Sequence, residues 1–216
     1  MRTILLSLFL FITCIMNAQI FDVNSAQMVL DSQRAYLNAY GQMTQRAIQI
    51  MHAVQPYREA MYQKYKEGAY RDALEICYKT YSQYVYYKFD NRGMSDMELL
   101  AGDCAAILKN YELAILWYNN AKEAEEGNAN SRLLELFNIK VSDARNSFKK
   151  NDMSKLYEDV TIALKTGWES GECYYYYGVC YENGNNLKDA KRMYKLAKKK
   201  KYNPAVDALK SMKKKK

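Results

Sequence analysis

The stretch 178–197, GVCYENGNNLKDAKRMYKLA, reads as two short helical segments that flank a polar turn. Its small residues and one tyrosine recur at identical offsets earlier in the chain. The two matching sets are Gly178, Ala190, Tyr194 and Ala197, and Gly102, Ala114, Tyr118 and Ala121. A repeat of this kind predicts an array of similar helical units.

Two weaker copies extend the array toward the N-terminus and through its middle. They consist of Ala73, Cys77 and Thr80, and of Met153, Leu156, Val160 and Ala163. The corresponding small-residue positions 73, 114, 156 and 190 are 41, 42 and 34 residues apart, which is the range of helical arrays. The two longer spacings imply extended helices or loops in those units.

Physical chemistry explains the recurring residue types. Two helix axes approach closely where Gly or Ala lies between them, and an aromatic side chain on the second helix fills the space alongside. Each pair leaves an apolar edge that the next pair covers, so the terminal units need a cap. Polar turns interrupt the pattern where such pairs require them, at 66–68, 109–110, 149–152 and 182–186.

On these residues, with Pro204 following the last copy, the chain resembles the tetratricopeptide repeat, a helix-turn-helix unit of 34 residues. The resemblance covers about 56–203, and it weakens where Met61 and Ala144 replace the glycine. It implies an all-α fold, an α-solenoid of about four stacked antiparallel helix pairs. It also implies a concave groove for peptides or partner proteins, lined by the first helix of each pair. It implies no catalytic activity.

Flanking segments complete the expected domain plan. Residues 1–18 have a basic start and an apolar run, which is typical of a secretory signal peptide. A membrane anchor and lipidation at Cys14 are alternatives. An N-terminal helix is expected within 19–55, starting at Asn24-Ser25, and a short capping helix is expected from Pro204 to Lys210, within a basic C-terminal segment 204–216. The expected localisation is therefore exported: periplasmic, envelope-associated or secreted.

Charge is concentrated at the C-terminus. Thirteen of the 32 Lys and Arg residues lie in 187–216, against two of the 24 acidic residues. The basic tail Lys213, Lys214, Lys215 and Lys216 could attract an anionic membrane or polysaccharide, although such a run is often only a solvated end. Nucleic acid is a less favoured partner, because no aromatic residue is interleaved with this run to stack on a base.

The repeat register predicts which side chains line the groove. They are Arg58, Tyr62, Tyr65, Leu99, Asp103, Val141, Arg145, Phe148, Tyr175, Tyr176, Val179 and Glu182. In the run 174–177, Tyr174 and Tyr177 are assigned to the packed side. Tyr and Arg dominate binding hot spots, but a Tyr-rich solenoid also uses tyrosine in its core, and both readings stay open.

Nothing in the sequence predicts an enzyme, a metal site or a cofactor. His52 is the only histidine, so no pair of imidazoles can be assembled, and no phosphate-binding loop is present. Cys77 and Cys104 could pair across neighbouring helices or remain buried thiols. The expected function is a non-enzymatic scaffold that holds a protein or peptide, with docking of the basic tail on an anionic surface as the alternative.

Overall fold

The computed structural model describes residues 41, 45–85, 93–124 and 126–214. The chain divides into two compact units, 1–46 and 47–216. In the first unit, residues 41 and 45–46 are helical. The predicted signal peptide, Cys14 and most of the expected N-terminal helix lie outside the described residues, as do Lys215 and Lys216.

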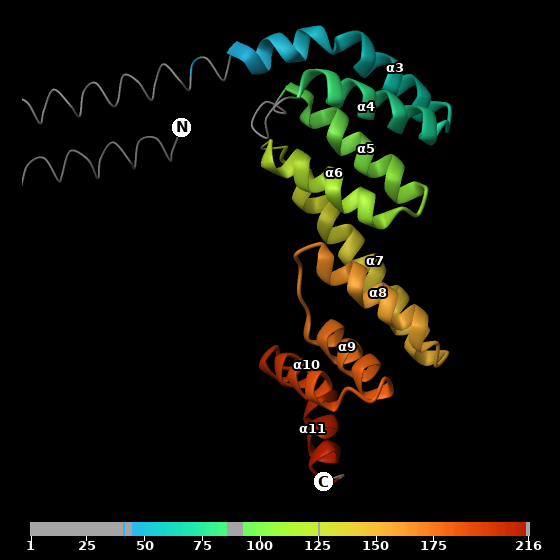
Figure 1. Cartoon of the computed structure of the whole chain (residues 1–216), viewed down its shortest axis with the longest axis vertical. Helices are drawn as coiled ribbons and strands as arrows, with labels where there is room; N and C mark the ends of the chain where they lie inside the picture. Colours follow the sequence, from blue (N-terminus) through green and yellow to red (C-terminus); the bar gives the residue numbers. More distant parts are fainter. Residues whose placement is uncertain (1–40, 42–44, 86–92, 125, 215–216) are drawn as a thin grey trace, which may run out of the picture. The chain divides into compact units, whose positions relative to one another are not determined.

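The second unit begins with helical residues 47–53 and continues through nine further helices in the described ranges (Figure 1). They are α3 (Gln55–Lys66), α4 (Tyr70–Tyr84), α5 (Ser95–Ile107), α6 (Tyr111–Glu123), α7 (Ala129–Lys149), α8 (Met153–Lys165), α9 (Gly171–Asn183), α10 (Leu187–Lys199) and α11 (Pro204–Lys214). The last helix extends four residues beyond the predicted end at Lys210.

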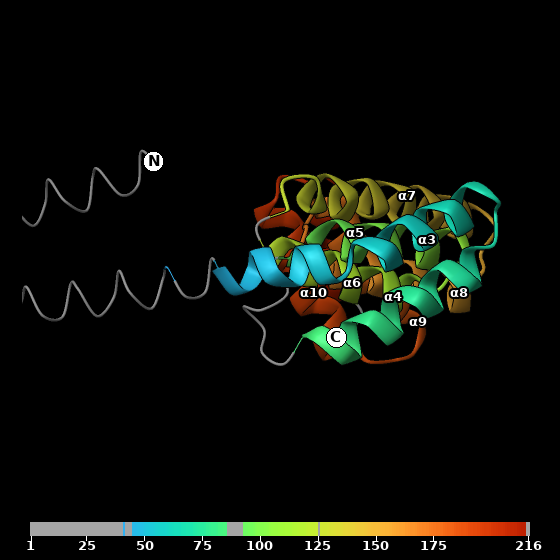
Figure 2. The ribbon, with the colours of Figure 1, turned by 90° about the horizontal axis from the view of Figure 1, so that it is seen from above.

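Neighbouring helices pack in sequence order, which confirms the predicted all-α solenoid. The four pairs are α3 with α4, α5 with α6, α7 with α8, and α9 with α10, and α11 packs on α10. Seen from above, the successive pairs overlie one another (Figure 2). Helix α11 covers the end of the last pair with Ala205, which is fully buried, and with Leu209 and Met212, which are half-buried.

The repeated glycine and tyrosine meet at the centre of two pairs. A Cβ atom on Gly102 would lie 2.3 Å from Cε1 of Tyr118, and one on Gly178 would lie 2.6 Å from Cε1 of Tyr194. Both tyrosines are almost fully buried. Only glycine leaves room for the ring at these positions.

The first and third pairs fill the same position with side chains of other sizes. Met61 and Cys77 take it in the first pair, and Ala144 and Val160 in the third, and all four side chains are buried within their clusters. In every pair the two residues are 16 positions apart. A larger residue on the first helix accompanies a smaller one on the second, so the combined volume decides the fit.

The turns inside the pairs share one geometry. The second residue after the first helix has a positive φ, at Gly68, Lys109, Asn151 and Asn185. After α5, the amide of Asn110 donates to the carbonyl of Ala105 and the amide of Lys109 to that of Ala106, which is the Schellman pattern. The Asn110 side chain then accepts from the amide of Leu113 and caps α6.

Helix α7 accounts for the longer spacing of the third unit, since it has 21 residues and its partner α8 has 13. Leu133 and Leu136, in its first half, pack in the cluster that holds Ala114 and Tyr118. Phe137 and Val141 belong to the next cluster, with Val160 of α8. One continuous helix therefore contributes to the cores of two consecutive pairs.

A buried charge pair joins α7 to α8. Nζ of Lys140 lies 3.2 Å from Oδ1 of Asp159 and 2.9 Å from Oδ2 of Asp143, and it lies 3.9 Å from the centre of the Tyr111 ring. The hydroxyl of Ser147 donates to the other oxygen of Asp159. Lys140 is 2% exposed and Asp159 0%, so all their polar atoms depend on partners inside the protein.

Candidate functional site

An open hollow lies between α3 and α5 and has a volume of about 390 Å³. We call it the N-terminal hollow. Its lining residues are Arg58, Glu59, Met61 and Tyr62 of α3 and Asp96, Met97, Leu99, Leu100 and Asp103 of α5. Four predicted groove residues are thus brought together here: Arg58, Tyr62, Leu99 and Asp103. Tyr62 is 52% exposed, with the Lys66 ammonium 4.4 Å from its ring centre.

Hydrogen bonds to residues of α3 and to residues at the start of α5 hold Arg58 in place. Its guanidinium contacts both carboxylate oxygens of Asp96, at 2.5 and 3.1 Å, and donates to the carbonyl of Gly93 at 3.0 Å. It also donates to the side chain of Gln55 at 2.7 Å. Because its donors are engaged inside the protein, Arg58 orients α3 on α5.

A second hollow, the middle hollow, continues this surface across α5 and α7 and has a volume of about 200 Å³. It shares Asp103 with the N-terminal hollow and includes the predicted Tyr65. Oδ1 of Asp103 accepts from the Tyr118 hydroxyl at 2.9 Å, and Oδ2 accepts from Arg132 at 3.2 Å. Ile107 and Ile139, 45% and 46% exposed, give the hollow an apolar rim that the sequence register did not predict.

The centre of the predicted groove is closed by packing, which corrects the sequence expectation for Val141 and Tyr176. Val141 is 8% exposed and Tyr176 is 4% exposed. The Tyr176 ring lies 5.0 Å from that of Phe148, and its hydroxyl donates to Glu172 at 3.0 Å. Arg145 forms a two-pronged ion pair with the same carboxylate, at 2.9 and 2.7 Å.

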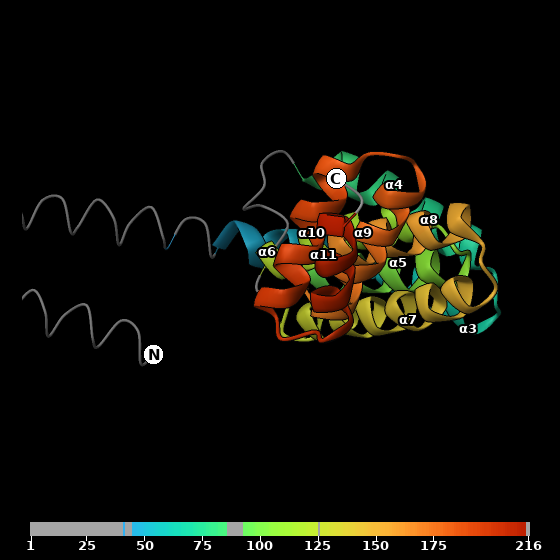
Figure 3. The same cartoon turned by 90° about the horizontal axis from the view of Figure 1, so that it is seen from below.

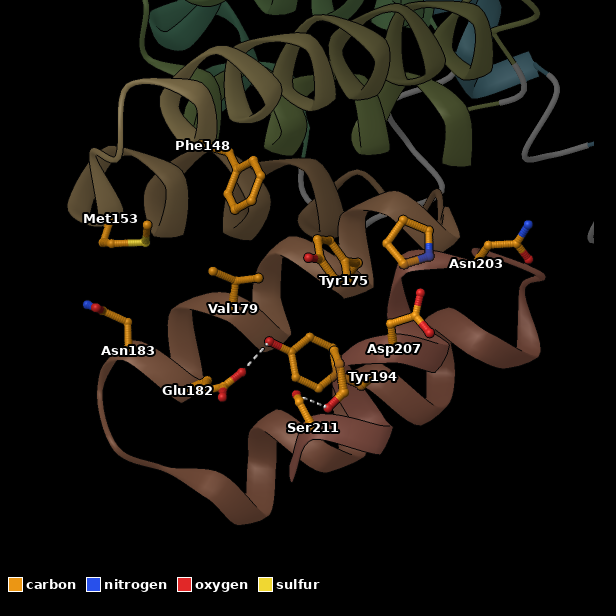
Figure 4. Close-up of a pocket in the computed structure, with 12 residues that line it drawn as sticks. Phe148, Met153, Tyr175, Val179, Glu182, Asn183, Tyr194, Asn203, Asp207 and Ser211 are labelled. Carbon is orange, nitrogen blue, oxygen red and sulfur yellow. Dashed lines mark hydrogen bonds between the residues drawn. The ribbon is translucent and has the colours of Figure 1, made fainter. Parts of the chain in front are cut away.

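A third hollow, of about 730 Å³, lies at the C-terminal end of the stack (Figure 4). We call it the C-terminal hollow. It is lined by Phe148, Met153, Tyr175, Val179, Glu182, Asn183, Tyr194, Asn203, Pro204, Asp207, Ala208 and Ser211. Four predicted groove residues meet here: Phe148, Tyr175, Val179 and Glu182. Glu182 accepts a hydrogen bond from the Tyr194 hydroxyl at 2.8 Å, and Asp207 and Ser211 of α11 lie across from α9.

The tyrosine run 174–177 surrounds one turn of α9, as its length requires. Tyr174 packs beside the α10 and α11 core, and Tyr177 stacks on Tyr157 with ring centres 5.4 Å apart. Tyr175 lies 5.4 Å from the ring of Tyr202 and 5.6 Å from that of Tyr194. Tyr175 is therefore the member of the run that forms a wall of the C-terminal hollow.

The cysteine thiols of the described residues are held in the protonated form. Burial raises the pKa of the thiols of Cys104 and Cys180 to about 11 and that of Cys173 to about 12, and it raises the pKa of the Cys77 thiol further. All four thiols are unbridged. They stay protonated near neutral pH, whereas nucleophilic cysteines need a lowered pKa.

Lys140 stays protonated because its carboxylate neighbours outweigh the effect of burial. Burial alone lowers the pKa of its ammonium, but hydrogen bonds and attraction from Asp143 and Asp159 outweigh burial and raise the pKa above its usual value. A permanently protonated lysine cannot serve as a base. We therefore assign Lys140 to the packing of α7 on α8.

Two further properties concern the described residues only. No group of three His, Cys, Asp or Glu side chains among them is arranged to hold a metal ion. No helix among them combines the length and the apolarity that a bilayer crossing requires.

The basic C-terminus is partly visible. Lys213 is an exposed residue of α11, whereas the predicted tail residues Lys215 and Lys216 lie outside the described part of the chain. More cations lie on α10, where the structure gives them a common orientation.

The chain was compared with models of known protein families, and none matches. A comparison with curated proteins likewise found no match.

Proposed function

We propose that the protein is a non-catalytic scaffold that binds a peptide or protein segment on the face formed by the first helices of its pairs. The observation that carries the proposal is the set of three open hollows described above, which α3, α5, α7 and α9 line together with parts of α6, α8, α10 and α11, and which contain tyrosine and aliphatic side chains beside acidic ones. The tetratricopeptide-like pattern supports the binding role, and the signal-like start of the sequence supports a place in the cell envelope.

The composition of the hollows favours binding over chemistry. Tyr62 and Tyr175 are large, semi-rigid side chains that bury much area at a small entropic cost, as hot-spot residues do. The charged groups beside them are held by inter-helix contacts such as Arg58 with Asp96. A surface whose side chains are already positioned loses little freedom when a ligand binds.

The test uses a library of random 12-residue peptides, selected on the immobilised protein and then measured by fluorescence polarisation. Tyr62→Ala and Tyr175→Ala should each weaken selected peptides by about 1 to 3 kcal/mol, the range of an interface hot spot. Tyr78→Ala is the matched control, since Tyr78 is 66% exposed on α4 and lines none of the three hollows. If the peptides bind the folded double variant as tightly as the wild type, the hollows are not the binding site.

A further inference from the structure

Six cations follow one face of α10: Lys188, Lys191, Arg192, Lys195, Lys198 and Lys199. Their spacing of three and four residues places them along one side of the helix. All six are exposed, and α10 lies at the end of the stack with α11, facing the viewer in Figure 3. We call this surface the cationic face.

The opposite side of α10 fixes the orientation of the cationic face. Ala190, Tyr194 and Ala197 are at most 1% exposed and pack against α9 and α11. The helix cannot turn about its axis without removing these side chains from the core. The cations are consequently held outward over a rise of about 16 Å, from position 188 to position 199.

Little of this charge is balanced within the part of the chain that the structure describes. Within the described residues, Arg192 pairs with Asp189 at 3.3 Å, and the other five cations of the face form no ion pair. Like charges three or four residues apart on a helix destabilise it by about 0.2 to 0.5 kcal/mol per pair. The arrangement is unfavourable in isolation and becomes favourable against an anionic surface.

Two exposed apolar side chains lie near the two ends of α10. Leu187, 47% exposed, precedes it at the start of α10. Trp168, 41% exposed, lies in the loop before α9, and the ion pair of Glu169 with Lys200 at 2.9 Å holds that loop beside the end of α10. Tryptophan and leucine next to lysine are the residues that enter the interfacial layer of a bilayer.

From these observations we propose that the cationic face docks the protein on an anionic phospholipid bilayer. Lysines near such a surface each contribute about 1 kcal/mol of attraction. A nucleic acid is disfavoured because five of the six cations are lysines, which do not supply the planar two-pronged contacts of arginine, and no aromatic residue lies among them. This inference does not depend on the hollows of the first helices.

The test measures sedimentation of the full chain with vesicles of phosphatidylcholine and phosphatidylserine at low and physiological salt. The triple variant Lys188→Gln, Lys191→Gln, Lys195→Gln should lower the partition coefficient on the order of 100-fold. A matched control changes the same net charge elsewhere, with Lys66→Gln, Lys79→Gln and Lys122→Gln on α3, α4 and α6. The control should stay close to the wild type, and circular dichroism confirms that both variants are folded.

Trp168 provides an independent signal, because Trp117, the other tryptophan, is 4% exposed in the core. Vesicles should shift the fluorescence of the wild type to the blue, and Trp168→Phe should abolish the shift. If the partition coefficient falls equally in the two triple variants, net charge alone explains the binding and the proposal is overturned. The proposal is also overturned if the wild type does not bind the vesicles, or if it binds a DNA duplex or heparin in preference to them.

Discussion

Replacing Gly102 with alanine tests the packing rule on which the solenoid depends. The new methyl group would lie 2.3 and 2.4 Å from two ring carbons of Tyr118, whereas real Cβ contacts shorter than 3.0 Å are essentially never seen. The ring is 3% exposed, and its hydroxyl donates to Asp103 at 2.9 Å, so it cannot rotate away without losing that bond. The helices α5 and α6 must therefore separate.

The magnitude follows from two opposing effects. Overpacking a core costs about 1 to 3 kcal/mol, and this contact is close enough to place the cost at the upper end. Alanine is better than glycine in a helix by about 1 kcal/mol. The expected net loss is about 2 kcal/mol of unfolding free energy, or roughly 4 to 8 °C in melting temperature for a domain of this size.

Urea unfolding followed by far-UV circular dichroism measures the loss. Gly127→Ala is the control, because a Cβ there meets nothing within 4 Å and the backbone φ is not positive. That substitution should change the unfolding free energy by about 0.5 kcal/mol or less.

A double-mutant cycle makes the prediction refutable. The third pair already combines alanine on the first helix with valine on the second, at Ala144 and Val160. In a Tyr118→Val background, Gly102→Ala should therefore cost nothing or stabilise by up to about 1 kcal/mol, which gives a coupling energy of about 2 to 3 kcal/mol. An equal cost of Gly102→Ala in both backgrounds would refute the reasoning.

Two further predictions concern charge. Lys140→Met leaves the buried carboxylate of Asp159 without its main partner and should lower the unfolding free energy, measured in urea, by about 3 to 5 kcal/mol. Adding Asp159→Leu should recover most of this loss. A double variant as unstable as the single one would contradict the reasoning. The hydrogen bonds from Arg145 lower the pKa of the Glu172 carboxyl in the folded protein. This ion pair therefore stabilises the fold fully above the unfolded pKa of about 4.5, and the stabilisation is lost as the pH falls through the folded pKa. Wild-type stability should accordingly fall more steeply between pH 5 and 3 than that of Glu172→Gln, and parallel curves would rule this contribution out.

The pairing of helices could be predicted from sequence because its determinants are local and repeated. Gly102 and Tyr118, like Gly178 and Tyr194, are 16 residues apart within one pair, and the turn residues between them are equally regular. The longer third unit was predicted to contain an extended helix or loop, and α7 supplies the helix.

The details of the binding face depend on distant partners and were less predictable. Arg58 meets Asp96 across 38 residues, and nothing in the repeat register signals that pair. Tyr176 was placed in the groove by register, but Phe148 and Glu172 provide a better site for its ring and hydroxyl inside the stack. The hollows exist where no such partner fills the space.

The cationic face illustrates the opposite case. The spacing of Lys188, Lys191 and Lys195 is visible in the sequence, but its meaning depends on which side of α10 is buried. The repeat pattern already predicts that Ala190 and Ala197 pack against a neighbouring helix, and their complete burial confirms that the lysines lie on the outward side.

The length of α7 limits how the stack can bend. A solenoid usually flexes where one unit meets the next, because only side-chain contacts resist the motion there. Here one unbroken helix carries Leu133 into one core and Val141 into the following one, so bending at that junction would have to pull Leu133 and Leu136 out of the earlier core. The second and third pairs should consequently move as a single rigid segment, and the distance between the middle hollow and the Arg145 contact should stay constant while the ends of the array fluctuate.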